Sequence, residues 1–168
     1  LFIDGEKVIT SRESIVQTSL PSSIAIVGGG PIGVEFAYIY KMYGVDVTVV
    51  ELLPRLIPNE DEEISPLLER AFSKMGINVM TGAGVTGVDI SGNGAKLSVE
   101  KDGATQSLDV DQVLVAIGVQ ANTEDLGLET LGIEIQRGLI QVDDVMATNI
   151  PGVYAVGDVT GKLALAHV

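Results

Sequence analysis

Three glycines in the first third of the chain have the spacing of turns that hold phosphate groups. Gly28, Gly30 and Gly33 form G-x-G-x-x-G between an apolar run at 23–27 and a segment of helical periodicity. The first glycine would allow a tight turn, the second a close backbone approach to a pyrophosphate, and the third close packing of helix on strand. The N-terminus of the following helix would offer unpaired N–H groups to the phosphates. This pattern predicts dinucleotide binding; the alternative is a glycine-rich turn without a ligand.

An acidic residue closes the next apolar run. Glu51 follows Gly33 by eighteen residues and comes directly after residues 45–50. A carboxylate there is expected to accept hydrogen bonds from the adenosine ribose hydroxyls and to repel a 2′-phosphate, which favours NAD over NADP. Arg55 could in principle receive a 2′-phosphate, but we interpret it as a solvated arginine in a turn. Glu35, one residue past the glycine motif, is either a further contact or a surface acid favoured by the helix dipole, and the sequence leaves both interpretations open.

The elements that must position these residues alternate between strands and helices. Apolar runs are expected to form parallel strands that are covered on both faces. The helix after Gly30 is expected to end at Gly44, and Asn59 with the four acids after it predicts the next helix start. Pro66 should kink that helix or mark a second start at Ser65. The predicted β-α-β-α-β unit, half of a doubly wound sheet, has its strands at 23–27, 45–50 and 77–81.

A different pattern follows this unit. Three short strands separated by glycine-containing turns predict an antiparallel β-meander, and a later apolar run at 113–117 is expected to return to the parallel sheet. Residues 119–150 carry no clear pattern. The fold class is therefore α/β, a Rossmann-like three-layer domain that combines a parallel sheet with an antiparallel meander. The meander strands are expected at 85–90, 95–100 and 105–110.

Both ends of the chain are less regular. Residues 1–10 are expected to form two extended runs around the turn Asp4–Gly5, followed by a polar connector that ends at Pro21. Near the C-terminus, residues 148–158 predict a turn, a short strand at 153–156 and an acid, Asp158, at its carboxyl end. Ligands bind at this position in such sheets.

Composition excludes several classes of site. The net charge of −13 repels nucleic-acid phosphates and anionic membrane surfaces. The chain has no cysteine and one histidine, His167, so we expect no disulfide, no thiolate chemistry, no metal site and no Ser-His-Asp triad. No apolar run is long enough for a membrane span and no leader precedes Leu1, so we expect a soluble, cytoplasmic protein.

The two motifs, in this order, resemble those of the flavoprotein pyridine nucleotide-disulfide oxidoreductases, and nearly the whole chain is similar to the dihydrolipoamide dehydrogenases. The resemblance rests on the sequence motifs VVELLPR at 49–55, VAIG at 115–118 and LAH at 165–167. The resemblance implies NAD contacts at Gly28, Gly29, Gly30, Pro31, Ile32, Gly33, Val34, Glu35, Glu51, the backbone near Val85, and Gly118. It implies FAD contacts at Asp158, Ala164, Leu165, Ala166 and His167.

The resemblance also has departures. Val119 and Ala121 stand where the family usually has an arginine and a proline, which puts in doubt the local packing near the cofactors. Pro31 replaces the aromatic that gates the nicotinamide pocket in glutathione reductase-like relatives, which favours the dehydrogenase branch. His167 matches a flavin-side element and not the family's catalytic base. The resemblance implies a connector from an FAD domain at 1–20, an NAD-binding domain at 21–147 and a returning FAD-domain segment at 148–168.

The implied activity is that of a flavin-dependent enzyme in which dihydrolipoamide reduces a redox disulfide, electrons pass to FAD, and a hydride passes to NAD. The cysteine pair, the first FAD-binding unit and the C-terminal dimerisation domain are not in this sequence, so the chain alone is expected to be inactive. The implied partners are NAD(H), those FAD and dimerisation domains, and through them a 2-oxo acid dehydrogenase complex. The alternatives are another two-dinucleotide flavoenzyme (NADH oxidase, mercuric reductase or transhydrogenase) or a stand-alone, non-catalytic NAD-binding module.

Overall fold

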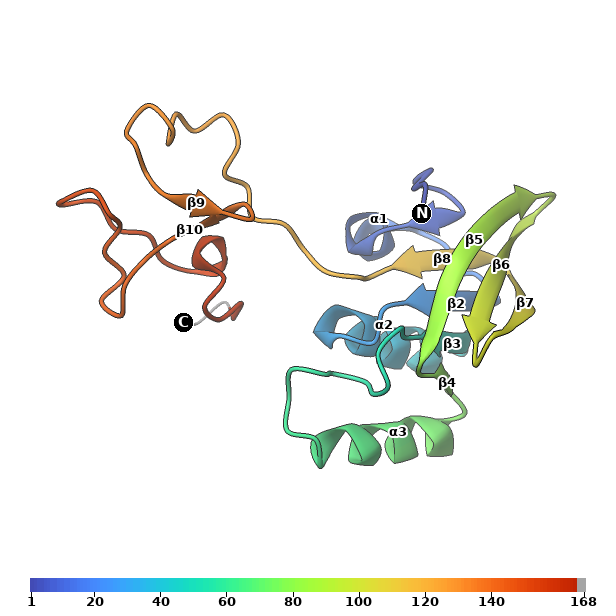
Figure 1. Ribbon diagram of the computed structural model, residues 1–168. Coiled ribbons are helices and arrows are strands. Elements are labelled where there is room, and N and C mark those ends of the chain that lie inside the picture. Colours follow the sequence, from blue (N-terminus) through green and yellow to red (C-terminus); the bar gives the residue numbers. More distant parts are fainter. Residues whose placement is uncertain (166–168) are drawn as a thin grey trace. The chain divides into compact units, whose positions relative to one another are not determined.

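Strand β2 is the central strand of a five-stranded parallel sheet of order β1-β8-β2-β3-β4 (Figure 1). A computed structural model describes residues 1–165 of the chain. Every pair of neighbours in this sheet is parallel. The apolar runs around the glycine motif therefore form the strands that were predicted, with residues 112–115 returning beside β2. The strands are β1 (Val8–Ile9), β2 (Ser23–Val27), β3 (Asp46–Val50), β4 (Asn78–Met80) and β8 (Gln112–Val115).

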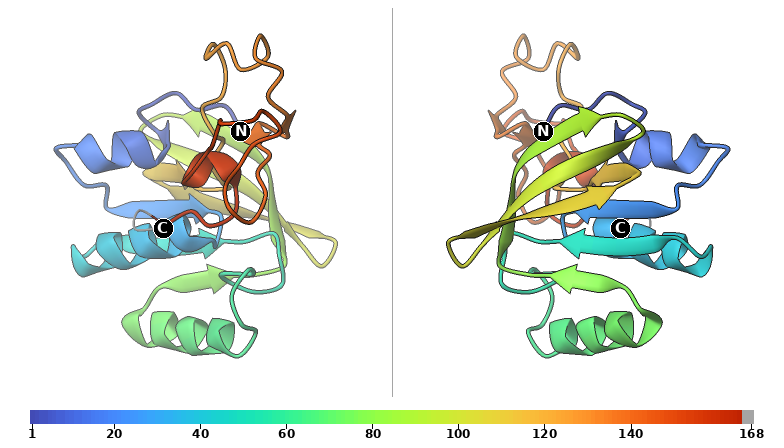
Figure 2. Two further views of the ribbon diagram at one scale, coloured as in Figure 1. Left: turned by 90° about the vertical axis from the view of Figure 1, so that its left-hand side faces the viewer. Right: turned by 90° about the vertical axis from the view of Figure 1, so that its right-hand side faces the viewer.

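Two other layers cover this sheet, one on each face (Figure 2). Alternate residues of β2 separate them: Ile24 and Ile26 pack with the helices, whereas Ala25 and Val27 pack with the antiparallel meander. Layers on both faces of the sheet bury β2 from Ile24 to Val27, which is why these four residues are all apolar. The expected α/β class with an antiparallel meander is confirmed. The covering elements are α2 (Pro31–Met42), α3 (Ile64–Met75), β5 (Ala83–Ser91), β6 (Gly94–Lys101) and β7 (Ala104–Val110).

Helix α3 resolves the two alternatives offered for Pro66. The helix begins at Ile64, with Glu63 as its N-cap residue, so Pro66 lies in the first turn. A proline is tolerated there because the first N–H groups of a helix have no intrahelical partner. The acids at 60–63 precede the helix rather than form its first turn, and Gly76 ends it in the left-handed conformation.

The polar connector expected before Pro21 contains a short helix, so that part of the prediction was wrong. Helix α1 (Ser11–Val16) begins at a capping box, in which the Glu13 carboxylate accepts the Thr10 N–H at 2.8 Å. The Thr10 hydroxyl also donates to this carboxylate, and these hydrogen bonds hold the pKa of Glu13 below its ordinary value. The Thr-x-x-Glu pattern at 10–13 is the sequence signal that would have located the helix.

Tyr40 ties α1 to α2 through its hydroxyl group. The side chain is 2% exposed, its hydroxyl lies 2.7 Å from Ser14 Oγ, and Gln17 Nε2 donates to it at 2.6 Å. Burial raises the pKa of Tyr40 above its ordinary value.

Tyr40→Phe should therefore destabilise the chain by about 1 kcal/mol, the usual net contribution of a part-buried hydrogen bond. We expect the melting temperature to fall by roughly 2–6 °C. Thermal unfolding followed by circular dichroism measures this, with Tyr38→Phe as the matched control because Tyr38 is half-exposed. Equal melting temperatures for Tyr40→Phe and the unmodified chain would contradict the assignment.

Contacts between residues divide the chain into two units, Leu1–Gly118 and Val119–Val168. The second unit has a small core that includes Ile133, Ile140 and Ala155. Its regular elements are the antiparallel pair β9 (Ile135–Gln136) and β10 (Leu139–Ile140) and the 3-10 helix η1 (Asp158–Thr160). The domain boundaries that the family resemblance implies, between residues 20 and 21 and between residues 147 and 148, stay a prediction.

The strand expected at 153–156 does not form. Tyr154 makes one isolated antiparallel bridge to Ala147, and no strand is assigned to the segment. The segment still alternates, with Ala155 buried and Tyr154 and Val156 exposed. A strand also needs a neighbour along its length, and the described part of this unit supplies only that bridge. None of the helices that the structure describes has the length and apolar character needed to cross a membrane.

Candidate functional site

The carboxyl ends of three neighbouring parallel strands meet at the glycine turn. Gly28 follows β2 and its N–H donates to the carbonyl of Val50 in β3 at 2.9 Å. On the other side, the N–H of Ala116, which follows β8, donates to the Val27 carbonyl at 2.8 Å. The turn is thus held between the two strands that flank β2. This edge is where ligands bind in open α/β sheets.

Two of the motif glycines have no room for a side chain. A Cβ added to Gly28 would lie 2.3 Å from the Ala116 carbonyl oxygen, and Gly28 has a φ of +114°. A Cβ added to Gly33 would lie 1.9 Å from the Gly28 carbonyl oxygen. Gly28 therefore lets the turn approach the segment after β8, with the positive φ of a tight turn, and Gly33 lets the start of α2 pack directly on the end of β2, as the spacing predicted for each.

Gly30 differs from both, because an added Cβ would meet nothing within 4 Å. It is the N-cap residue of α2 and has an ordinary extended conformation, with φ −75° and ψ −175°. Pro31 has no N–H, and the N–H groups of Ile32 and Gly33 belong to the first turn, which has no intrahelical acceptor for them. Gly30 thus leaves open space at the N-terminus of α2, and the positive end of a helix dipole favours an anion.

Glu51 lies beside this turn and is bound to it. The residue is 8% exposed, and its carboxylate accepts the Gly29 N–H at 2.5 Å and the Leu53 N–H at 2.6 Å. A carboxylate offers about four acceptor positions, so two remain for hydroxyl groups of a ligand. The sequence predicted a ribose acceptor here. The structure adds that the same carboxylate orients the glycine turn.

The other residues expected to contact NAD are spread around this edge. Pro31 and Glu35 are exposed on α2, whereas Ile32 and Val34 are half-buried against the helix-side core. The exposure of Glu35 agrees with both of its interpretations. Val85 is half-buried in β5, next to an irregularity in the pairing with β6. Gly118 is exposed beyond the end of β8 and has a φ of +138°.

Arg55 is not the solvated arginine that was expected. It is half-buried, and its Nη2 donates to the Pro58 carbonyl oxygen at 2.7 Å. Its Nη1 is buried without a hydrogen-bond partner among the described residues. The guanidinium thus fixes the loop between β3 and α3 instead of extending into solvent.

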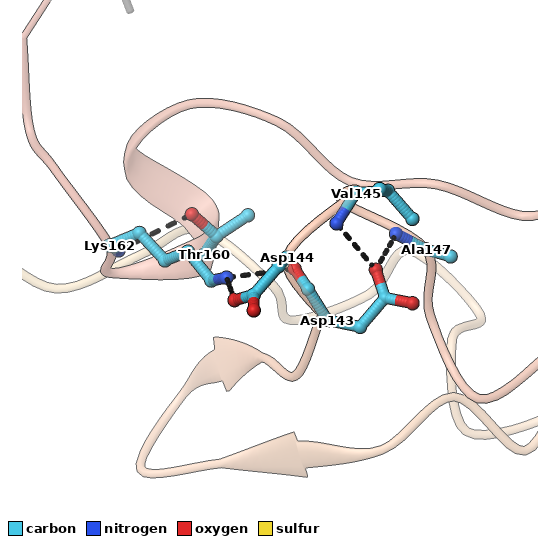
Figure 3. A network of polar contacts seen from close by, with 6 residues as sticks. All are labelled: Asp143, Asp144, Val145, Ala147, Thr160 and Lys162. Atoms are coloured by element: carbon cyan, nitrogen blue, oxygen red, sulfur yellow. Dashed lines mark hydrogen bonds and ion pairs between the residues drawn. The ribbon is translucent and has the colours of Figure 1, made fainter.

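The predicted flavin contacts lie in the second unit. Asp158 is the exposed first residue of η1, and the Thr160 hydroxyl donates to the Gly157 carbonyl at 2.8 Å. Lys162 Nζ binds the segment after η1 to the Asp143 carbonyl, at 2.8 Å, and to the Asp144 carboxylate, at 3.3 Å (Figure 3). Ala164 and Leu165 are exposed. Ala166 and His167 lie outside the described residues.

Sequence reasoning missed the residues that hold Gly29, the hydrogen-bond donor to Glu51, in place. Leu56 is fully buried and packs against Gly29, and the buried Ser65 hydroxyl donates to the Leu56 carbonyl at 2.6 Å. The Ile57 N–H donates to the Gly29 carbonyl at 2.7 Å. Nothing in the sequence shows that residues from an irregular loop and from α3 meet at this turn.

The whole chain, residues 1–168, matches the family described as Pyridine nucleotide-disulphide oxidoreductase. It is 49% identical over 162 residues to a dihydrolipoyl dehydrogenase of Mycobacterium leprae, covering 96% of this chain and 35% of that protein. It is 44% identical over 167 residues to a dihydrolipoyl dehydrogenase of Corynebacterium glutamicum, covering 98% of this chain and 36% of that protein. The chain therefore spans about a third of the length of the curated relatives it matches.

Solved structures give the same similarity. LpdA from Mycobacterium tuberculosis superposes with a TM-score of 0.87 at 36% identity, over 98% of this chain and 36% of that one. The HOCl-induced flavoprotein disulfide reductase RclA from Escherichia coli superposes with a TM-score of 0.84 at 32% identity, over 99% of this chain and 37% of that one. The parallel sheet and the meander are thus an arrangement found in flavoprotein reductases.

Proposed function

The chain belongs to the pyridine nucleotide-disulphide oxidoreductase family, and we propose that it is the NAD(H)-binding portion of a flavin-dependent dihydrolipoyl dehydrogenase. The observation that carries the proposal is the contrast among the motif glycines. Gly28 and Gly33 are closed by backbone atoms, whereas Gly30 is open on the side where α2 begins. A turn required only for packing has no reason to leave its middle glycine uncovered.

The residues present fit a dinucleotide with a free 2′-hydroxyl. The backbone of residues 28–33 and the N-terminus of α2 would bind the pyrophosphate, and Glu51 would accept hydrogen bonds from the adenosine ribose. NAD, when bound, supplies the hydride acceptor of the overall reaction. The contribution of this chain is to hold and orient it. The remaining proposed contacts are Pro31, Val34, Glu35, the backbone at Val85, and Gly118.

Contacts with the flavin are proposed for the second unit. Asp158 is exposed at the start of η1, which is where a carboxylate could bind the ribityl chain, and Ala164, Leu165, Ala166 and His167 would lie along the flavin. FAD, the redox disulfide and the substrate dihydrolipoamide belong to the proposed complete enzyme. A 2-oxo acid dehydrogenase complex is its proposed partner. The similarity to dihydrolipoyl dehydrogenases supports these assignments.

Calorimetric titration of the 168-residue chain tests the proposed function. We expect NADH to bind at least roughly tenfold more tightly than NADPH, because a 2′-phosphate would face the Glu51 carboxylate and lose its ribose hydrogen bonds. The enthalpy and the dissociation constant are measured for both cofactors in the same buffer and salt. Equal or tighter binding of NADPH would contradict the NAD assignment, and no binding of either cofactor would contradict the site.

A further inference from the structure

Ser65 is a buried serine at the start of a helix that does not cap its own helix. It is the second residue of α3 and is 1% exposed. The N-cap residue of α3 is Glu63, which makes no side-chain cap hydrogen bond, and Ser65 does not supply one in its place. The Ser65 hydroxyl instead donates to the carbonyl of Leu56, nine residues earlier, at 2.6 Å. A buried polar group directed out of its helix marks a contact that holds two elements together.

Leu56 is the point at which the loop between β3 and α3 meets the glycine turn. Its side chain is fully buried, and its Cδ2 would lie 2.6 Å from a Cβ placed on Gly29. The next residue, Ile57, donates its N–H to the Gly29 carbonyl at 2.7 Å. Ile57 has a φ of +42°, which is rare for a β-branched residue, so its surroundings must hold it there.

Both backbone groups of Gly29 are thus occupied by this loop. Its N–H donates to Glu51 at the beginning of the loop, and its carbonyl accepts from Ile57 near the end. The backbone of Glu51 continues directly from β3, and its carboxylate is bonded to Gly29. Gly29 is in turn bonded to the loop at Ile57, and α3 holds this loop through Ser65. A second, longer contact runs from the Leu56 N–H to Glu69 Oε1, at 3.4 Å.

We propose that Ser65 is a positioning residue for the dinucleotide site, which sets the preference for NAD over NADP without touching the cofactor. By fixing Leu56, it keeps the Glu51 carboxylate against Gly29 and directed at the 2′-position of the adenosine ribose. The inference rests on the proposed NAD-binding function. It adds a residue of α3 that the glycine motif and Glu51 do not reveal.

Ser65→Ala tests the inference through the ratio of the dissociation constants of NADPH and NADH. Without the hydroxyl, the Leu56 carbonyl loses its partner and the loop loosens. We expect NADH affinity to fall roughly three- to tenfold and NADPH affinity to stay unchanged, so that the ratio falls by the same roughly three- to tenfold factor. The matched control is Ser14→Ala, which removes a hydroxyl bonded to the buried Tyr40 near the far end of α2 and should leave the ratio unchanged.

Amide hydrogen exchange in the cofactor-free chain provides a readout that does not depend on binding. The amides of Leu53 and Ile57 donate to Glu51 and Gly29, so both should exchange faster in Ser65→Ala and at the unmodified rate in Ser14→Ala. If Ser65→Ala fails to fold, Glu69→Ala is measured in its place. Glu69 is half-buried and its contact is longer, so the same shifts are expected at a smaller size.

The outcomes separate this inference from the proposed function. Failure of the unmodified chain to bind NADH would overturn the proposed function and this inference with it. Tight NADH binding by the unmodified chain, with an unchanged cofactor ratio or unchanged exchange at Leu53 and Ile57 in Ser65→Ala, would overturn the role of Ser65 alone.

Discussion

Gly30→Val is expected to abolish NADH binding by the 168-residue chain while leaving it folded, with a melting temperature lowered by no more than about 4 °C, because valine caps a helix less well than glycine. An added Cβ at Gly30 meets nothing within 4 Å, and the φ of −75° with ψ of −175° suits valine. The fold therefore has no reason to change. The isopropyl group would occupy the open side of the α2 N-terminus, where the pyrophosphate is proposed to lie against the backbone.

Two other glycines serve as controls for this result. Gly87→Val introduces the same side chain on β5, again with nothing within 4 Å, and should leave both NADH affinity and melting temperature unchanged. Gly33→Ala should do the opposite of Gly30→Val, because its Cβ would lie 1.9 Å from the Gly28 carbonyl oxygen and the turn could not form. We expect that variant to lose its cooperative unfolding transition. Unchanged NADH affinity in a folded Gly30→Val chain would show that the turn does not bind phosphate.

The comparison among these glycines also shows what the sequence could predict. The order of turn, helix and strand around Gly28 to Glu51 follows from contiguous apolar runs interrupted by glycine, and these signals are local. The meander could be predicted equally well, because Asp-Gly is a dipeptide typical of hairpin turns. Asp102 and Gly103 indeed both adopt positive φ between β6 and β7. Helix α1 was not predicted although its capping box is also local. A six-residue helix with no buried residue has no apolar periodicity that would indicate it.

The contacts that hold the glycine turn in place could not be predicted from the sequence, because they join residues that only the fold brings together. Ser65 and Leu56 are nine residues apart, one in a helix and one in an irregular loop, and only the fold brings them to Gly29. A second helix start at Ser65 was one of the two alternatives for Pro66, and it would have made this serine a cap and not a partner of Leu56. The prediction that Arg55 is solvated was wrong for a similar reason, because its hydrogen bond to the Pro58 carbonyl depends on the path of the loop. Tertiary contacts of this kind leave no periodic signal.

Glu51→Ala is expected to have two effects that can be measured separately. In the cofactor-free chain, the buried N–H of Gly29 loses its acceptor, and an unsatisfied buried donor destabilises a protein by about 1–3 kcal/mol, whereas the N–H of the exposed Leu53 can bond water. The melting temperature should fall accordingly. In the complex, loss of a charged partner of the ribose should weaken NADH binding by about 1.5–3 kcal/mol, which is roughly 10–150-fold.

The two cofactors distinguish a ribose contact from a purely structural acid. If Glu51 only orients the turn, its removal disturbs the pyrophosphate site and weakens NADH and NADPH by the same factor. If it also accepts the ribose hydroxyls, NADH loses affinity while NADPH, freed from a repulsive carboxylate, loses little or gains. Glu60→Ala, an exposed acid in the same loop, removes the same charge and should change neither constant by more than about twofold. A parallel loss for both cofactors in Glu51→Ala would therefore contradict the ribose assignment and leave only the hydrogen bonds to Gly29 and Leu53.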